Sequence, residues 1–158
     1  SAASDVYKRQ PHCGAFAVIR LCSYFLAYFA LCTCVQFTPR VGALWTLALV
    51  LERTLSGYAV AAFPMAKNTG LAHTFATAAD KTTVRRVLTV LAVVLAACMM
   101  FLRGWALVLA ALAVLFYYNK MSAKQFGGIT GDLAGWFLQK AELWMLAALV
   151  ACQWGGLL

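Results

Sequence analysis

A short polar loop near the C-terminal end carries the residues best suited to chemistry. Residues 127–132 read GGITGD and lie between two long hydrophobic segments. Glycines let a backbone turn sharply and approach a ligand closely, and successive exposed N–H groups can cradle an anion. The Asp132 carboxylate could hold Mg²⁺ against a phosphate. A helix–helix connector in which Asp132 caps the last helix explains the same spacing, and spacing alone does not separate the two interpretations.

The elements that position this loop are predicted to be membrane helices. Of the 158 residues, 64% are hydrophobic and 11% are charged, and the mean hydropathy is +0.81. This composition lies far outside the soluble range, so we predict an all-α fold, a polytopic transmembrane helical bundle. Apolar runs of spanning length predict about five spans. These lie roughly at Gly14–Val35, Val41–Phe63, Leu88–Leu102, Trp105–Tyr118 and Leu133–Trp154.

The charge pattern predicts how the chain is oriented in the membrane. The net charge is +8, but most basic residues lie in short loops between spans, which favours a topology signal over nucleic-acid binding. With alternating spans, the polar stretches 64–86 and 119–132 share one side and hold six lysines and arginines. The other side receives Arg40 and Arg103. The excess predicts a multi-pass protein of the plasma (inner) membrane with both polar stretches in the cytoplasm.

Two spans contain charged residues at a depth where charge is expensive. Glu52 and Arg53 lie near the middle of the second span, and Glu142 lies inside the last one. Such residues are functional candidates that should face the bundle or a polar cavity. Mutual neutralisation explains the first pair equally well, and the nearby Lys140 could neutralise Glu142.

Other chemistry-bearing residues give weaker signals. Lys67 beside Gly70 can contact a phosphate, although a single lysine there also fits an interfacial position. The six cysteines and two histidines lack metal-site spacing, so neither zinc nor a disulfide framework is predicted.

The ends of the chain differ in character. Ser1–Gln10 is polar and stops abruptly at Pro11, and we expect it to be a non-native tail. Residues 11–158 show no internal repeat and are predicted to form a single transmembrane domain. The sequence has five acidic residues, and Asp132 alone is a thin supply for Mg²⁺-dependent phosphoryl transfer. This deficit agrees with a missing N-terminal portion.

The motifs resemble those of the cobalamin synthase (adenosylcobinamide-GDP ribazoletransferase) family. Residues 127–135, GGITGDLAG, are similar to the family's G-G-x-T-G-D-x-x-G signature, and Glu142 to the acidic position that follows it. Residues 66–71, AKNTGL, resemble its A-R-x-x-G-L loop, with Lys67 in place of arginine, and Arg53 stands where the family tends to carry an arginine. The resemblance covers residues 11–158. The family's acidic H-x-D-G-x-x-D-x-x-D motif is expected upstream of residue 11.

The resemblance implies a late step of cobalamin (vitamin B12) biosynthesis. The adenosylcobinamide-phosphate moiety of adenosylcobinamide-GDP would pass to α-ribazole, or to its 5′-phosphate, with release of GMP and with Mg²⁺ as cofactor. Asp132 would be the catalytic residue and metal ligand. Substrate-binding residues would be Gly127, Gly128, Thr130, Gly131, Lys67 and Arg53. The resemblance also implies that the chain is the C-terminal part of a larger enzyme, so the chain alone is expected to be inactive.

Three other functions are compatible with the composition. In a small multi-pass transporter, Glu52 and Arg53 would line a pathway, but paired broken helices are not evident. A membrane phosphotransferase of the CDP-alcohol type needs a D-G-x-x-A-R motif that the sequence lacks. A structural membrane subunit would not need the glycine loop. Membrane lipid is an expected partner, nucleic acid is not, and a homo-oligomer is left open.

Overall fold

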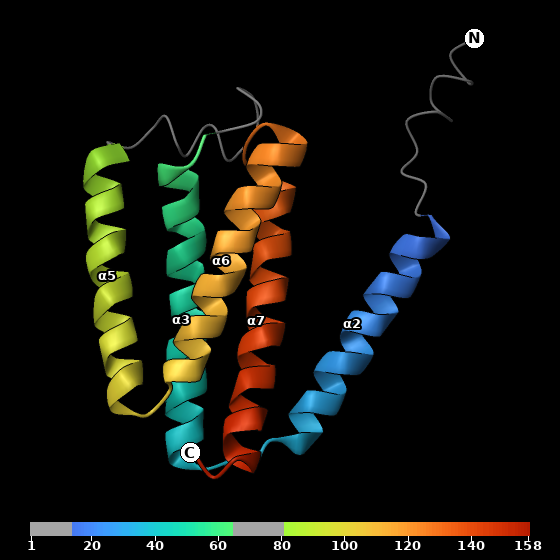
Figure 1. Cartoon of the computed structure of the whole chain (residues 1–158), viewed down its shortest axis with the longest axis vertical. Helices are drawn as coiled ribbons and strands as arrows, with labels where there is room; N and C mark the ends of the chain where they lie inside the picture. Colours follow the sequence, from blue (N-terminus) through green and yellow to red (C-terminus); the bar gives the residue numbers. More distant parts are fainter. Residues whose placement is uncertain (1–13, 65–80) are drawn as a thin grey trace. The chain divides into compact units, whose positions relative to one another are not determined.

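The described part of the protein consists of helices joined by short connections. A computed structural model describes residues 14–64 and 81–158, and Ser1–Gln10 lies outside this part. Within these ranges no β-strand is present, so the prediction of an all-α fold is confirmed. The helices are α2 (Ala15–Cys34), α3 (Pro39–Ala62), α5 (Lys81–Phe101), α6 (Trp105–Phe126) and α7 (Gly131–Trp154) (Figure 1).

The number of helices that could span a membrane is consistent with the predicted number of spans. Four helices, α2, α5, α6 and α7, are long and apolar enough to cross a membrane. Helix α3 has 24 residues, which is also long enough, but Glu52 and Arg53 lower its hydropathy. Its apolar residues pack against α5, α6 and α7, which shield it from its surroundings. The chain is therefore an integral membrane protein, and about five spans remains a consistent count.

Backbone contacts divide the chain into two units, Ser1–Thr33 and Cys34–Leu158. The described part of the first unit is essentially α2, and none of its residues is buried. Apolar side chains cover this helix on all sides, as expected of a helix that contacts lipid or another apolar partner.

The second unit is a bundle of α3, α5, α6 and α7 around one core. Short turns make α5–α6 and α6–α7 antiparallel neighbours, and α7 also packs along α3. Large side chains that are essentially fully buried fill the centre, among them Leu44, Leu107, Phe137, Met145 and Leu149.

Two contacts close this bundle at the end opposite the glycine loop. The predicted hairpin turn at Arg103 and Gly104 is confirmed, and a side chain on Gly104 would collide with Leu44. The Gln153 side chain donates to the Gln36 carbonyl at 2.7 Å and accepts from its N–H at 3.2 Å. This pair fixes the segment before α3 to the last turn of α7.

Two helices are longer than the sequence predicted. Helix α5 begins at Lys81 rather than near Leu88, and α6 continues past Tyr118 to Phe126. The prediction of loop at residues 81–86 and 119–126 was therefore wrong. Polarity was the misleading signal, because lysine, arginine, glutamine and methionine are good helix formers. Only residues 127–130 separate α6 from α7.

Candidate functional site at the α6–α7 loop

The first half of the glycine loop ends α6. Gly127 adopts a left-handed conformation with φ 69°, and Gly128 also has a positive φ of 151°. Both backbone N–H groups donate to the Ser122 carbonyl, that of Gly128 at 3.1 Å. Glycine is favoured at such a helix end because a side chain is strained at positive φ. The N–H groups of both glycines are thus already hydrogen-bonded to the C-terminal end of α6.

The second half of the loop begins α7. The Thr130 hydroxyl accepts a hydrogen bond from the Leu133 N–H at 3.3 Å, which makes Thr130 the N-cap. The alternative in which Asp132 caps the last helix is therefore wrong. The N–H groups of Gly131 and Asp132 have no acceptor among the described residues. Together with the helix dipole they form the part of the loop best able to meet an anion.

Asp132 lies beside these two open donors. It is exposed in the first turn of α7, where a carboxylate interacts favourably with the helix dipole. Across residues 14–64 and 81–158 there is no cluster of three or more histidine, cysteine or acidic side chains. The described cysteines, Cys22, Cys32, Cys34, Cys98 and Cys152, form no disulfide. The loop therefore supplies a single carboxylate.

A hydrogen bond joins the loop to the chain that leaves α3. The buried Ile129 donates its N–H to the Pro64 carbonyl at 2.8 Å. Pro64 opens the long polar stretch of the sequence, and α3 ends and α5 begins at this end of the bundle (Figure 1). The two polar stretches thus share one end, as the sequence predicted. Lys67 lies outside the described residues.

Aromatic packing holds α6 and α7 together directly below the loop. The ring of Tyr118 stacks on Phe137 with centroids 5.3 Å apart, and Trp136 tilts against Tyr117 at 5.9 Å. Tyr118 is fully buried, and its hydroxyl has no hydrogen-bond partner in the part of the chain that the structure describes. These contacts give the loop a rigid base.

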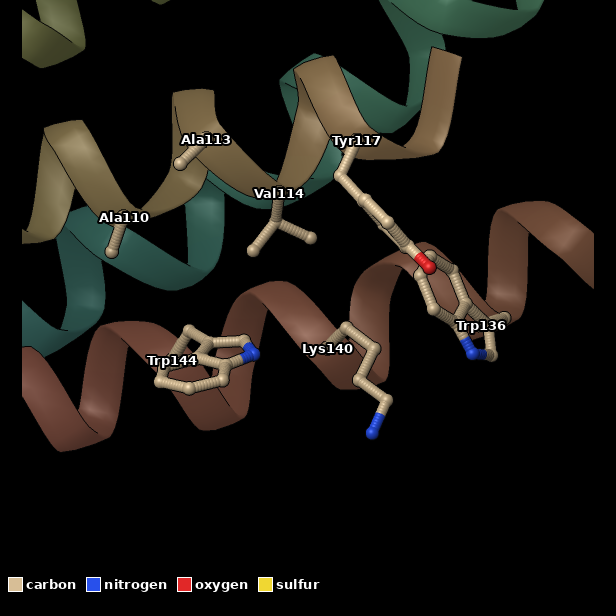
Figure 2. A pocket seen from close by; sticks show the side chains of 7 residues that line it. All are labelled: Ala110, Ala113, Val114, Tyr117, Trp136, Lys140 and Trp144. Atoms are coloured by element: carbon tan, nitrogen blue, oxygen red, sulfur yellow. The ribbon is translucent and has the colours of Figure 1, made fainter. Parts of the chain in front are cut away.

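A groove between α6 and α7 opens below Asp132. It has a volume of about 470 Å³. The residues that line it are Ala110, Ala113, Val114, Tyr117, Trp136, Lys140 and Trp144 (Figure 2). The sequence analysis did not identify this groove. Its signal was the four-residue spacing of positions 132, 136, 140 and 144, which places those side chains near one face of a helix.

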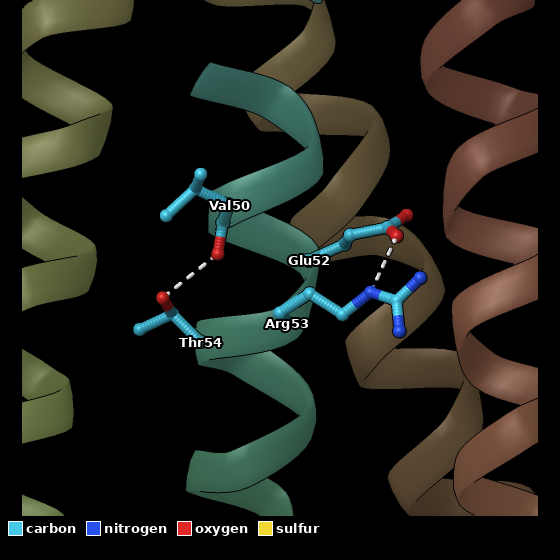
Figure 3. A network of polar contacts seen from close by, with 4 residues as sticks. All are labelled: Val50, Glu52, Arg53 and Thr54. Atoms are coloured by element: carbon cyan, nitrogen blue, oxygen red, sulfur yellow. Dashed lines mark hydrogen bonds and ion pairs between the residues drawn. The ribbon is translucent and has the colours of Figure 1, made fainter. Parts of the chain in front are cut away.

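A buried carboxylate lies deeper in the same bundle. Glu52 is fully buried, and its Oε1 lies 3.4 Å from Nε of Arg53, whose side chain is 69% exposed (Figure 3). The contact has ion-pair distance but lacks hydrogen-bond alignment, so neither oxygen has a hydrogen-bond partner among the described residues. Arg53 lies about 13 Å along α3 from its loop end, so the structure does not bring it to the Thr130–Asp132 segment.

Known proteins resemble this chain over most of its length. Residues 8–150 match the family described as cobalamin-5-phosphate synthase. A protein named adenosylcobinamide-GDP ribazoletransferase, from Lachnoclostridium phytofermentans, is 38% identical over 151 residues. The match covers 92% of this chain and 56% of that relative, so the chain spans little more than half of the relative's length. No solved structure matches the chain. The family match and the identity together show that the chain belongs to the cobalamin-5-phosphate synthase family.

Proposed function

We propose that the protein containing this chain transfers the adenosylcobinamide-phosphate moiety of adenosylcobinamide-GDP to α-ribazole or its 5′-phosphate. A ribazole hydroxyl oxygen forms the new bond to the phosphorus attached to cobinamide. The bond from that phosphorus to GMP breaks, and the hydroxyl proton leaves to a base. Family membership and the name of the relative support the reaction class. The observation that supports assigning the reaction to particular residues is the pair of N–H donors beside Asp132, at the start of α7, that have no acceptor among the described residues.

In this proposal the start of α7 binds the diphosphate. The N–H groups of Gly131 and Asp132 face an anion favourably because of the helix dipole. Gly127 and Gly128 act by shaping the loop, since their own N–H groups bond to Ser122. Thr130 holds the first turn in place. Lys67, which follows soon after Pro64 in the sequence, supplies positive charge to the substrate phosphates.

Arg53 has a different place in the proposal. Its exposed guanidinium lies well below the loop along α3. It would meet a part of the substrate that extends down the bundle rather than the reacting diphosphate.

A magnesium ion fits the donor set at the loop. One exposed carboxylate, Asp132, is present, and the described residues offer no cage of several acidic side chains. Mg²⁺ commonly binds one or two carboxylates, several waters and substrate phosphates. When bound, it neutralises charge on the diphosphate. We propose Asp132 as its ligand from this chain.

The proposed location is the plasma (inner) membrane, with the loop end of the bundle in the cytoplasm. The excess of lysine and arginine in the two polar stretches supports this orientation. A cysteine introduced at the exposed Lys124 should react with a membrane-impermeant reagent only after the cells are opened. Reaction in intact cells would reverse the orientation.

The test of the reaction is GMP release by the protein expressed from its complete reading frame in membranes. With adenosylcobinamide-GDP, α-ribazole and Mg²⁺, GMP should form. Asp132→Asn should abolish release without affecting insertion, and Asp132→Glu should retain part of the activity. A well-inserted protein that releases no GMP with either acceptor would overturn the proposal.

A further inference from the structure

Lys140 occupies an unusual place for a charged residue. It lies on α7 about 13 Å from the loop end, within a helix apolar enough to cross a membrane. Among the described residues, the ion pair of the bundle joins Glu52 and Arg53 and does not include Lys140. An ammonium group at that depth is costly unless it meets an anion or reaches towards the interface. Its surroundings in the groove therefore indicate what it binds.

The groove around Lys140 has an apolar floor and aromatic walls. Ala110 and Ala113 leave the space open on α6, while Trp136 and Trp144 flank Lys140 on α7 (Figure 2). Among the described residues that line it, Lys140 is the only charged one. The groove thus offers one positive charge beside an apolar slot.

The groove opens on the outer surface of the helix pair. Trp144 and Tyr117 are each 58% exposed, and the neighbouring Leu109, Leu112 and Phe116 on α6 are exposed as well. Exposed apolar side chains on helices of spanning length are compatible with contact to lipid chains. Tyr117 and Trp136 lie at the end of the groove nearer the loop, where such side chains favour the headgroup region.

The positive charge of Lys140 distinguishes among three candidate occupants of the groove. A second copy related by a twofold axis through the groove would place one Lys140 near the other. A zwitterionic lipid gives the ammonium only a partly neutralised phosphate. An anionic lipid provides both an apolar chain for the alanine floor and a net negative headgroup for the lysine.

We propose that the groove between α6 and α7 binds one anionic phospholipid. One acyl chain lies along Ala110 and Ala113. The headgroup phosphate accepts from the Lys140 ammonium, which extends along its flexible stem towards the loop end. Tyr117 and Trp136 border the headgroup. The site is separate from the reaction proposed above and does not depend on it.

The test is the lipid retained by the full-length protein after extraction from membranes of mixed phosphatidylglycerol and phosphatidylethanolamine. Native mass spectrometry counts the bound lipid. Lys140→Gln should lower retained phosphatidylglycerol about tenfold, the effect of losing one charge-assisted contact. Lys124→Gln removes the same charge from an exposed position outside the groove and should change nothing. Ala113→Leu keeps the lysine but fills the floor, and it should also lower retention.

Several results would overturn the proposal. One is equal retention in all variants. Another is an equal loss in both lysine variants, which would show diffuse attraction to charge. A third is indifference to the headgroup, with phosphatidylethanolamine retained equally well. Displacement of the lipid by α-ribazole 5′-phosphate would reassign the groove to a substrate. If Lys140→Gln fails to insert, Ala113→Leu decides alone, and normal retention in that variant overturns the proposal.

Discussion

Glu52 of α3 and Glu142 of α7 lie at the same depth in the bundle. The two helices are antiparallel, and each residue is about three turns from the loop end. Glu142 acts electrostatically on the Glu52 carboxylate, and the Arg53 guanidinium lies 3.4 Å from it. The unit therefore contains two carboxylates and a guanidinium at one level, where like charges in a poorly solvated site repel.

This arrangement predicts that Arg53 and Glu142 are energetically coupled. Arg53→Gln should lower the thermal unfolding midpoint in detergent because it removes the cation beside the buried Glu52 carboxylate, which Glu142 also repels. Adding Glu142→Gln should restore much of the loss by removing the repulsion. The coupling free energy expected for such neighbours is about 0.5–3 kcal/mol.

Arg86→Gln is the matched control for this cycle. Arg86 is exposed in the first turns of α5, away from Glu52 and Glu142 in the bundle. Its replacement should leave the midpoint unchanged, alone or combined with Glu142→Gln. Strict additivity of Arg53→Gln and Glu142→Gln would show that the guanidinium does not compensate the two carboxylates.

A substitution at Gly131 can tell whether the glycine is needed for close approach of a ligand or for the structure itself. A Cβ at Gly131 would meet no atom within 4 Å, and its φ is not positive. Gly131→Ala should thus leave stability unchanged or raise it by about 0.5–1 kcal/mol. If substrate contacts the backbone there, GMP release should nevertheless fall several-fold. Gly135→Ala, which is equally open one turn further along α7, should leave GMP release intact.

The Thr130 cap predicts a stability effect. Thr130→Ala removes the acceptor for the Leu133 N–H and should destabilise the protein by about 0.5–2 kcal/mol. Thr130→Ser keeps the hydroxyl and should retain most of the stability. Thermal unfolding of both variants measures the difference. Equal loss in the two would mean that the threonine methyl group, not its hydroxyl, holds the turn.

Much of the fold was predictable because long apolar runs in a sequence indicate membrane-spanning helices. The hairpin at Arg103 and Gly104 and the shared end of the two polar stretches also followed from the sequence. The start of α5 and the end of α6 could not be predicted in this way. Polar residues that favour helix extend both helices, and their polarity alone does not distinguish them from a loop.

The candidate site was predictable as a segment but not as a set of donors. Residues 127–132 were singled out from their types alone. Sequence could not show that Gly127 and Gly128 direct their N–H groups to Ser122, or that Thr130 is the cap. Those facts depend on where α6 stops. The Pro64–Ile129 bond joins residues far apart in sequence, which no local pattern encodes.

A substitution at Tyr118 tests whether its buried hydroxyl has a hydrogen-bond partner outside the described residues. Its buried hydroxyl lacks a partner within the described ranges, and an unsatisfied buried hydroxyl costs about 1–3 kcal/mol. Tyr118→Phe keeps the stacking on Phe137 and should therefore raise the unfolding midpoint. Tyr117→Phe, at an exposed tyrosine one residue away, should have little effect on it. A lower midpoint for Tyr118→Phe would instead mean that the hydroxyl donates to a group beyond the described residues. In that case the drop in stability would measure a contact that helps to hold the α6–α7 pair below Asp132.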